Sequence, residues 1–211
     1  ETVFDTELRE QMLLRMKNFK AIGLRESTEF DVITKNTDVH VEQVLDPTLL
    51  LPAEKYQTIM SERIIAEPYL LVYSRRQDTK MYDLAKKIAK EKGLTIVNIS
   101  LHTDADLDCN YQYGAGVEEF LSLIHYVITN SLHGTIFSVI LQKQFLVFPR
   151  IHGDKKIDKF LTLLNLEDRK VVDTEQEIPW QQQIDYKSVM SLLENYREKS
   201  IHYLKYISEL L

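Results

Sequence analysis

The sequence predicts an α/β protein built on a doubly wound parallel sheet. From Tyr69 onward, short apolar runs typical of buried strands alternate with segments whose apolar residues recur at helical spacing. Such alternation is typical of a parallel sheet covered by helices. The 211 residues, 44% of them hydrophobic and 27% charged, suffice for one full α/β layer domain and part of a second.

The N-terminal part, residues 1–52, is expected to contain helices and strands of a first, partial lobe. Asp46-Pro47 should end the last of these strands, and residues 49–52 resemble a link between two lobes. The predicted elements are a helix over 7–20, a strand over 19–25, a short helix capped by Ser27 or Thr28, and a strand over 39–45.

Residues 53–185 are expected to form the main sheet domain, with Gly93 as the C-terminal stop of a helix. The predicted strands are 69–73, 94–99, 126–129 and 145–148, with a short edge strand at 171–172. The predicted helices are 81–92, 117–124, 133–141 and 157–164. Residues 186–211 are expected to form an amphipathic helix that packs back on the body, because Ser200 interrupts a coiled-coil seam.

Composition excludes several classes of function. The six glycines form neither a dinucleotide-binding nor a Walker phosphate loop. A net charge of −6 offers no basic field, so no nucleic-acid partner is expected. One cysteine, Cys109, no signal peptide and no apolar run long enough to span a bilayer predict a cytoplasmic protein in a reducing compartment.

No metal site is expected either. No His, Cys, Asp and Glu set has metal-ligand spacing. Asp104, Asp106 and Asp108 resemble the start of a calcium loop, but the glycine and terminal glutamate that such a loop needs do not follow. We therefore interpret this segment as a solvated acidic loop. His125 is expected to be structural, in a turn between a helix and a strand.

The segment from Thr129 to Thr135 carries the strongest functional signal. It joins a predicted strand to a helix, and ligands of doubly wound sheets bind beyond the carboxyl ends of strands. Asn130 or Ser131 can cap the helix, whose free N–H groups attract anions, and Gly134 would let a ligand approach the backbone. His133 would face the crevice as an acid/base group or anion ligand. The alternative is a plain helix cap beside a structural histidine; the coincidence of all four features favours function.

This segment also carries a family resemblance. T-N-S-L-H-G-T-I-F-S at 129–138 resembles the T-N-S-F-H-G-T-x-F-S signature of the polysaccharide pyruvyl transferase family, and weaker motifs flank it in the same order, from about Lys20 to Arg169. These are I-G-L-R-E-S at 22–27, L-D-P-T-L-L at 45–50, E-E-F-L-S-L-I at 118–124, Q-K-Q-F at 142–145 and L-L-N-L-E-D-R at 163–169. The chain departs from the pattern at Leu132, Gln144 and Asn165 (family Phe, Pro and Gly), and at Asp158 or Lys159, where some members carry arginine.

The resemblance implies a fold similar to GT-B glycosyltransferases. Residues 1–52 would be the end of the N-terminal lobe, 53–185 the C-terminal Rossmann-like lobe and 186–211 a helix packing back on the body; most of the first lobe would lie upstream of Glu1. Such enzymes move the enolpyruvyl group of phosphoenolpyruvate onto a sugar of a surface polysaccharide, such as exopolysaccharide or capsule, or its precursor. The product is a pyruvate ketal. No cofactor beyond this donor is implied, and a lipid-linked glycan acceptor would place the enzyme at the inner membrane face.

A small, highly charged donor in an acidic chain needs local cations. The resemblance implies Arg25 and His133 as catalytic residues, with His133 either moving a proton or stabilising the departing phosphate. The predicted substrate-binding residues are Asn130, Ser131, Gly134, Thr135, Arg150, Lys155 and Lys156. The alternatives are a surface salt bridge of Arg25 with Glu26 or Glu29, and a merely solvated basic loop after residue 148.

Two other functions remain open at this level. A GT-B-type glycosyltransferase using a nucleotide sugar would share the fold, but no acidic residue that would hold the ribose is identified. A non-catalytic glycan-biosynthesis binding protein is the third hypothesis. The sequence identifies neither the acceptor sugar nor the oligomeric state.

Overall fold

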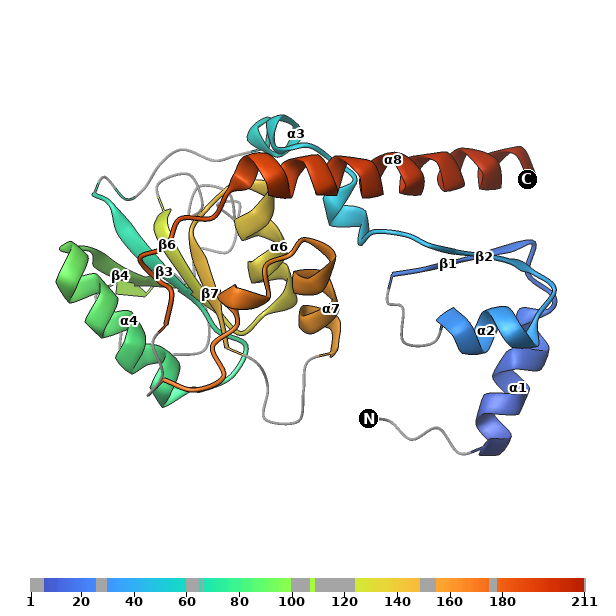
Figure 1. Ribbon diagram of the computed structural model, residues 1–211, viewed down its shortest axis with the longest axis horizontal. Helices are drawn as coiled ribbons and strands as arrows, with labels where there is room; N and C mark the ends of the chain where they lie inside the picture. Colours follow the sequence, from blue (N-terminus) through green and yellow to red (C-terminus); the bar gives the residue numbers. More distant parts are fainter. Residues whose placement is uncertain are drawn as a thin grey trace. The chain divides into compact units, whose positions relative to one another are not determined.

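A computed structural model describes residues 6–25, 30–59, 65, 67–99, 107–108, 124–148, 155–174 and 178–210. The chain forms two compact units, one of Glu1–Leu50 with Met190–Leu211 and the other of Leu51–Val189 (Figure 1). We call them the small unit and the sheet unit. Assignment of these units to the lobes of a GT-B-like fold stays a prediction.

The sheet unit contains a five-stranded sheet in the order β5-β4-β3-β6-β7, and every neighbouring pair of strands is parallel. Its strands are β3 (Tyr69–Tyr73), β4 (Thr95–Asn98), β5 (Leu107–Asp108), β6 (Ile124–Thr129) and β7 (Phe145–Val147). Its helices are α3 (Ala53–Gln57), α4 (Thr79–Lys92), α6 (Leu132–Ile140), α7 (Lys155–Leu163) and the 3₁₀ turn η3 (Glu167–Arg169). The predicted α/β class with a doubly wound parallel sheet is confirmed.

The sheet is wound in two directions from its centre. The chain leaves β3 through α4 to reach β4 on one side, and leaves β6 through α6 to reach β7 on the other. Because such crossovers are right-handed, α4 and α6 cover opposite faces (Figure 1). β3 and β6 are therefore the pair at which the winding direction reverses, and the crevice beyond their carboxyl ends is where such sheets bind ligands.

Local sequence explains the elements around this pair. All five residues of β3 are apolar or aromatic, and four of them are buried, as expected for a strand covered on both faces. In α4, Met81, Leu84, Ala85 and Ile88 recur at helical spacing and pack on the core. Asp78 caps α4 by accepting a hydrogen bond from Met81 N at 3.1 Å. Gly93 ends the helix at φ 64°, so the predicted stop is confirmed.

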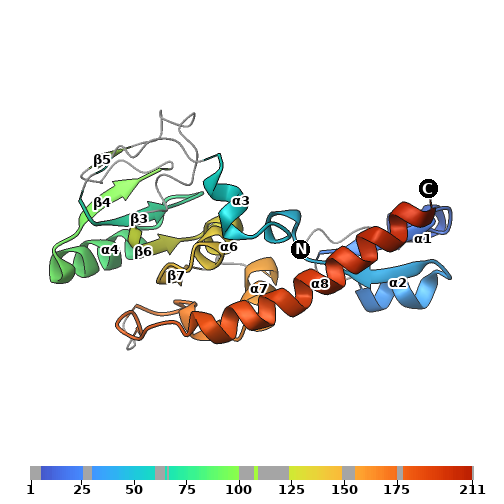
Figure 2. The ribbon, with the colours of Figure 1, turned by 90° about the horizontal axis from the view of Figure 1, so that it is seen from above.

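The small unit contains the parallel pair β1 (Ala21–Leu24) and β2 (His40–Gln43), and its core holds Ile22, Ile33 and Val41. The helices α1 (Thr6–Met16) and α2 (Phe30–Asn36) and the 3₁₀ turn η2 (Pro47–Leu49) complete its N-terminal part. The long helix α8 (Tyr186–Leu210) begins in the sheet unit and continues into the small unit from Met190 (Figure 2).

Within the small unit, α8 is joined to the segments that follow β2 and to β1. Ser200 Oγ accepts a hydrogen bond from Leu45 N at 2.9 Å, and the buried Arg197 donates from Nε to Leu49 O at 2.9 Å. Tyr203 lies against Gly23, where a Cβ would come within 2.9 Å of its Cε1. Ser200 therefore lies where α8 packs on the rest of the small unit.

Some sequence-based expectations were wrong. Residues 171–172 form no strand; only an isolated bridge pairs Val147 with Lys170. Asp108 lies in β5 rather than in a loop, and His125 lies inside β6 rather than in a turn. The predicted helix over 117–124 lies outside the described residues except for Ile124, which begins β6. Ser27, Thr28, Asp104, Asp106 and Cys109 also lie outside them.

Among the described helices, none combines the length and apolar composition needed to cross a bilayer.

Candidate functional site

The connection from β6 to α6 lies at the reversal point of the sheet and is tied to β3. Thr129, fully buried at the end of β6, donates from Oγ1 to Tyr73 O at 2.7 Å and accepts from Ser131 N at 3.0 Å. The ends of the two strands are therefore joined by one hydroxyl group. The N-termini of α4, α6 and α7 all lie at this edge of the sheet, the lower edge in Figure 1.

Asn130 links the connection after β6 to the connection after β3. Its Oδ1 accepts from Arg75 N at 2.7 Å, and its Nδ2 donates to Ser74 Oγ and to Arg76 O, both at 3.3 Å. The side chain is 1% exposed, so these bonds are shielded from water. Asn130 therefore fixes the backbone of Ser74–Arg76 beside the start of α6.

Ser131, not Asn130, caps α6. It has extended backbone angles, φ −111° and ψ 135°, and its Oγ accepts from Gly134 N at 3.4 Å. Thr135 is fully buried and donates from Oγ1 to Ser131 O at 3.0 Å, which closes the first turn from the inside. The sequence left open whether Asn130 or Ser131 caps the helix, and the cap geometry shows that Ser131 does.

Gly134 allows α6 to approach the strands closely. A Cβ at this position would overlap Thr129 Oγ1 and would lie 2.8 Å from Tyr73 Cδ1. The space at Gly134 is thus occupied by the protein itself, so its lack of a side chain is explained by packing. Direct approach of a ligand at Gly134 stays a prediction.

His133 is exposed on the first turn of α6, between the capping Ser131 and the buried Thr135. Its position is set by a buried framework, whereas its own side chain faces solvent at the carboxyl edge of the sheet. The helix start adds free N–H groups and the positive end of the helix dipole. The arrangement suits an anion held beside an imidazole.

Arg75 and Arg76 were missed by sequence analysis. They follow β3 directly, Arg75 exposed and Arg76 half-buried, and Asn130 holds their backbone. The signal was available: polar residues just beyond a buried strand lie at the same edge as those beyond its parallel neighbour. The backbone of both arginines is thus fixed beside the turn that carries His133, and a guanidinium group is a strong cationic donor.

The predicted basic cluster after β7 is described only in part. Lys155 and Lys156 are exposed on the first turn of α7, and β7 is the neighbour of β6, so they share its edge of the sheet. Arg150 lies outside the described residues. Asp158, on the same helix, forms an ion pair with Lys170 at 2.6 Å. Binding of substrate by Lys155 and Lys156 stays a prediction.

Arg25 belongs to the small unit and lies just after β1. Its NH1 forms an ion pair with Asp46 Oδ2 at 2.6 Å. The other carboxylate oxygen of Asp46 accepts from Thr48 N at 3.0 Å and from Thr48 Oγ1 at 2.6 Å. The alternative partners Glu26 and Glu29 lie outside the described residues. Two motifs separated in the sequence, at 22–27 and 45–50, thus meet through one oriented ion pair.

Burial shifts the pKa of several other ionisable groups near the core. Burial raises the pKa of Tyr126 in β6 and that of Tyr186, so both phenols stay neutral at physiological pH. Burial lowers the pKa of Lys143, just beyond α6.

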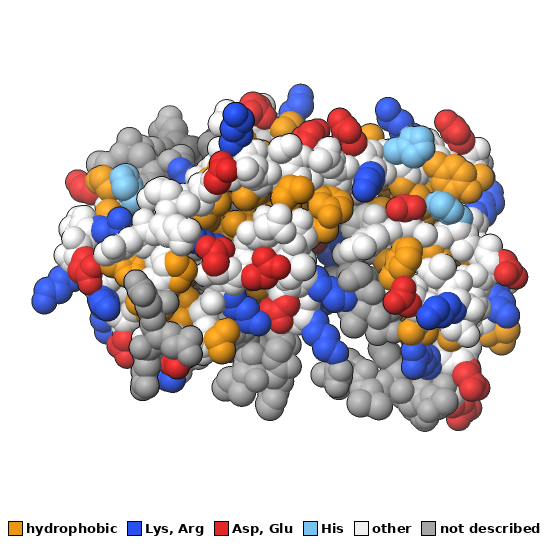
Figure 3. Space-filling model, viewed as in Figure 1, with side chains coloured by type: hydrophobic (Ala, Val, Ile, Leu, Met, Phe, Trp, Pro, Cys, Tyr) orange, Lys and Arg blue, Asp and Glu red, His pale blue; other side chains and the backbone are white. Residues whose placement is uncertain are grey.

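Among the described residues, no group of three or more His, Cys, Asp or Glu side chains is placed to hold a metal ion. Acidic and basic side chains are interspersed on the face in Figure 3.

Comparison with known proteins identifies the family. The family model described as polysaccharide pyruvyl transferase matches residues 2–152, which include Arg25, Asp46, Arg75, Arg76 and the whole turn with His133. The motif at 163–169 lies beyond the matched residues and stays a prediction. A search of curated proteins and a search of solved structures each found no match. The chain belongs to the polysaccharide pyruvyl transferase family and is an enzyme of this kind, a pyruvyl transferase acting on polysaccharide.

Proposed function

We propose that the enzyme transfers the enolpyruvyl group of phosphoenolpyruvate to a sugar of a surface polysaccharide or its precursor. The product is a pyruvate ketal, and phosphate is released. The observation that carries the proposal is the gathering of Arg75, Arg76, His133 and the start of α6 at the reversal point of the sheet. No cofactor beyond the donor is proposed. A lipid-linked acceptor would bring the enzyme to the inner membrane face.

The donor carries a carboxylate and a phosphate, and both need cationic or N–H donors. A guanidinium group holds either anion through two parallel hydrogen bonds. The backbone of Arg75 and Arg76 is fixed by the buried amide of Asn130, which lowers the entropic cost of ordering these donors. Arg25, oriented by Asp46, is proposed as a further guanidinium for the donor. Lys155 and Lys156 would add point charge.

The proposed reaction begins at the vinyl group of the donor. A proton adds to the vinyl CH₂ carbon of the donor, which becomes a methyl group, and a sugar hydroxyl attacks the adjacent cationic carbon. The bond from that carbon to the phosphate oxygen then breaks, and phosphate leaves with the bonding electrons. A second sugar hydroxyl attacks the same carbon and closes the ketal. Of the two hydroxyl protons, one passes to phosphate and the other replaces the proton added to the vinyl carbon, on His133 where His133 supplied it and in solvent otherwise. His133 either supplies the first proton or stabilises the departing phosphate.

The direct test supplies the full chain with phosphoenolpyruvate and a panel of free and lipid-linked oligosaccharide precursors. Phosphate release and incorporation of labelled pyruvate into the glycan are measured together. We expect phosphate release only when an acceptor is present, in equal amounts with incorporated pyruvate. Binding without transfer from phosphoenolpyruvate, or transfer of sugar from a nucleotide sugar instead, would refute the proposal.

Replacing Arg75 or Arg76 with alanine should raise the KM for phosphoenolpyruvate about 10- to 100-fold, because a charge-assisted hydrogen bond contributes about 1.5–3 kcal/mol. Arg75→Lys should recover only part of the loss, since lysine lacks the two-pronged geometry. The exposed Arg9 of α1 offers a matched control, and Arg9→Ala should leave this KM unchanged. An unchanged KM in both Arg75→Ala and Arg76→Ala would exclude these residues from the donor site.

A further inference from the structure

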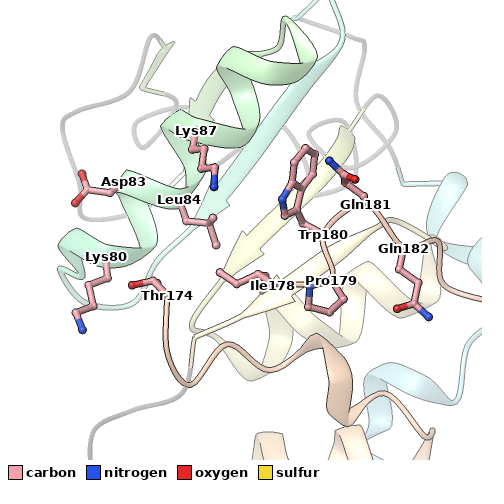
Figure 4. Close-up of a pocket in the computed structure, with 10 residues that line it drawn as sticks. All are labelled: Lys80, Asp83, Leu84, Lys87, Thr174, Ile178, Pro179, Trp180, Gln181 and Gln182. Carbon is pink, nitrogen blue, oxygen red and sulfur yellow. The ribbon is translucent and has the colours of Figure 1, made fainter. Parts of the chain in front are cut away.

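The sheet unit contains a pocket whose lining includes no residue of the turn that carries His133. This pocket of about 810 Å³ lies between the first half of α4 and the segment that ends at Gln182 (Figure 4). This volume is within the range of about 300–1,000 Å³ that is common for small-molecule sites. The lining residues that matter here are Lys80, Asp83, Lys87, Trp180, Gln181 and Gln182.

Hydrogen bonds from Arg169 hold one wall of this pocket in place. Arg169, 2% exposed, donates from NH1 to Pro179 O at 3.3 Å and to Gln182 O at 2.8 Å. Trp180 packs against the core cluster of the α4 face, and Lys92 Nζ lies 5.3 Å from the centre of its ring. The wall that carries Trp180, Gln181 and Gln182 is therefore anchored before any ligand arrives, which reduces the cost of binding.

The lining combines an aromatic ring with several kinds of polar group. In Figure 4 the Trp180 indole stands between Lys87 and Gln181, with Leu84 and Ile178 below it. Lys80 and Asp83 point outward from α4 at the rim. The two lysines outnumber the single carboxylate, so the lining is net positive in a chain whose formal net charge is −6.

These groups match a saccharide that carries an acidic substituent. The flat apolar face of an indole packs against the C–H face of a sugar ring, while its polar edge stays able to donate. Side-chain amides and hydroxyls donate to and accept from sugar hydroxyls, and a carboxylate accepts from them. Lysine ammonium groups attract a carboxylate without requiring one fixed geometry. Lysines at the rim of the pocket would therefore suit an acidic glycan.

We propose that this pocket binds acidic sugar units of the polysaccharide acceptor, at a distance from the sugar that reacts. Lys80 lies four residues after Arg76, so their Cα atoms are at most about 14 Å apart. A polymer held beside Arg76 can therefore also reach the pocket. Only the identity of the glycan as the acceptor rests on the proposed function; binding of an acidic saccharide does not.

The protein supplies its own probe, because Trp180 is its single tryptophan. The full chain is titrated with an oligosaccharide of alternating uronic acid and N-acetylhexosamine units, and separately with a neutral glucose oligosaccharide of equal length. Tryptophan emission is followed, and calorimetry checks the affinity. We expect a saturable change with the acidic oligosaccharide and at least tenfold weaker binding of the neutral one.

Charge reversal tests the site within the pocket. The double substitution Lys80→Glu and Lys87→Glu should weaken binding of the acidic oligosaccharide at least tenfold. Lys86→Glu is the matched control: Lys86 is exposed on the same helix but does not line the pocket, so its substitution should leave affinity unchanged. All of these positions are exposed, so folding should be preserved, and circular dichroism verifies this.

Three results would overturn the inference: no saturable change with either oligosaccharide, equal loss of affinity in the Lys86→Glu control, or tighter binding of uridine diphosphate than of the acidic oligosaccharide. The outcome is separable from that of the transferase proposal. Saccharide binding at Trp180 without pyruvyl transfer would refute only the transferase proposal. Pyruvyl transfer without any response of Trp180 to saccharide would refute only the pocket.

Discussion

Replacing His133 with alanine is expected to lower kcat for pyruvyl transfer about 10²- to 10⁴-fold, the usual contribution of a positioned acid/base group. The fold should not change, because His133 is exposed and the first turn of α6 is held by Ser131, Gly134 and Thr135. The measurement is steady-state phosphate release with saturating phosphoenolpyruvate and acceptor, together with a thermal unfolding curve.

His125 provides a matched control for this substitution. It is an exposed histidine at the amino end of β6, whereas His133 lies on α6, just beyond the carboxyl end of that strand. His125→Ala should therefore retain wild-type kcat. If His133→Ala also released phosphate at the wild-type rate, neither of the two roles proposed for His133 would hold.

A third variant separates those two roles. Arginine carries a positive charge but does not give up a proton at physiological pH. If His133 stabilises the departing phosphate, His133→Arg should recover much of the activity that His133→Ala loses. If His133 protonates the vinyl carbon, His133→Arg should remain as slow as His133→Ala.

The parts of the fold that were predicted from sequence are those that carry local patterns. β3 and the end of α4 are where the sequence placed them, because a buried strand is a continuous apolar run and Gly93 adopts the left-handed backbone that ends a helix. β5 was missed because two residues are too few for any periodicity. Its pairing with β4 is a contact between distant segments, which no local pattern encodes.

The location of the site was predicted from sequence, but the hydrogen bonds that hold it in place were not. The order of strand end, cap, glycine and histidine located the turn at 129–135. The partners of Asn130 come from Ser74, Arg75 and Arg76, more than fifty residues earlier in the chain, so they appear only when β3 and β6 pair. The same pairing explains why Gly134 is required, because it brings Tyr73 and Thr129 together beside this glycine.

Gly134→Ala is expected to reduce both stability and activity. The added Cβ would overlap Thr129 Oγ1 and come within 2.8 Å of Tyr73 Cδ1 and 3.1 Å of Thr129 Cβ. Thr129 cannot yield easily, because it is fully buried and donates from Oγ1 to Tyr73 O at 2.7 Å. Overpacking of this kind costs about 1–3 kcal/mol, which at about 2–4 °C per kcal/mol lowers the Tm by about 2–12 °C.

Activity should fall further than the loss of folded protein explains, since α6 must move away from β6 to make room and carries His133 with it. Gly93→Ala supplies the comparison: nothing lies within 4 Å of its added Cβ, so only the backbone strain at φ 64° remains, about 1 kcal/mol. Gly93→Ala should therefore lower the Tm but retain wild-type kcat per folded molecule. Calorimetric unfolding and phosphate release on the same samples separate the two variants. A Gly134→Ala protein with unchanged Tm and kcat would show that close packing of α6 on β3 and β6 does not set the position of His133.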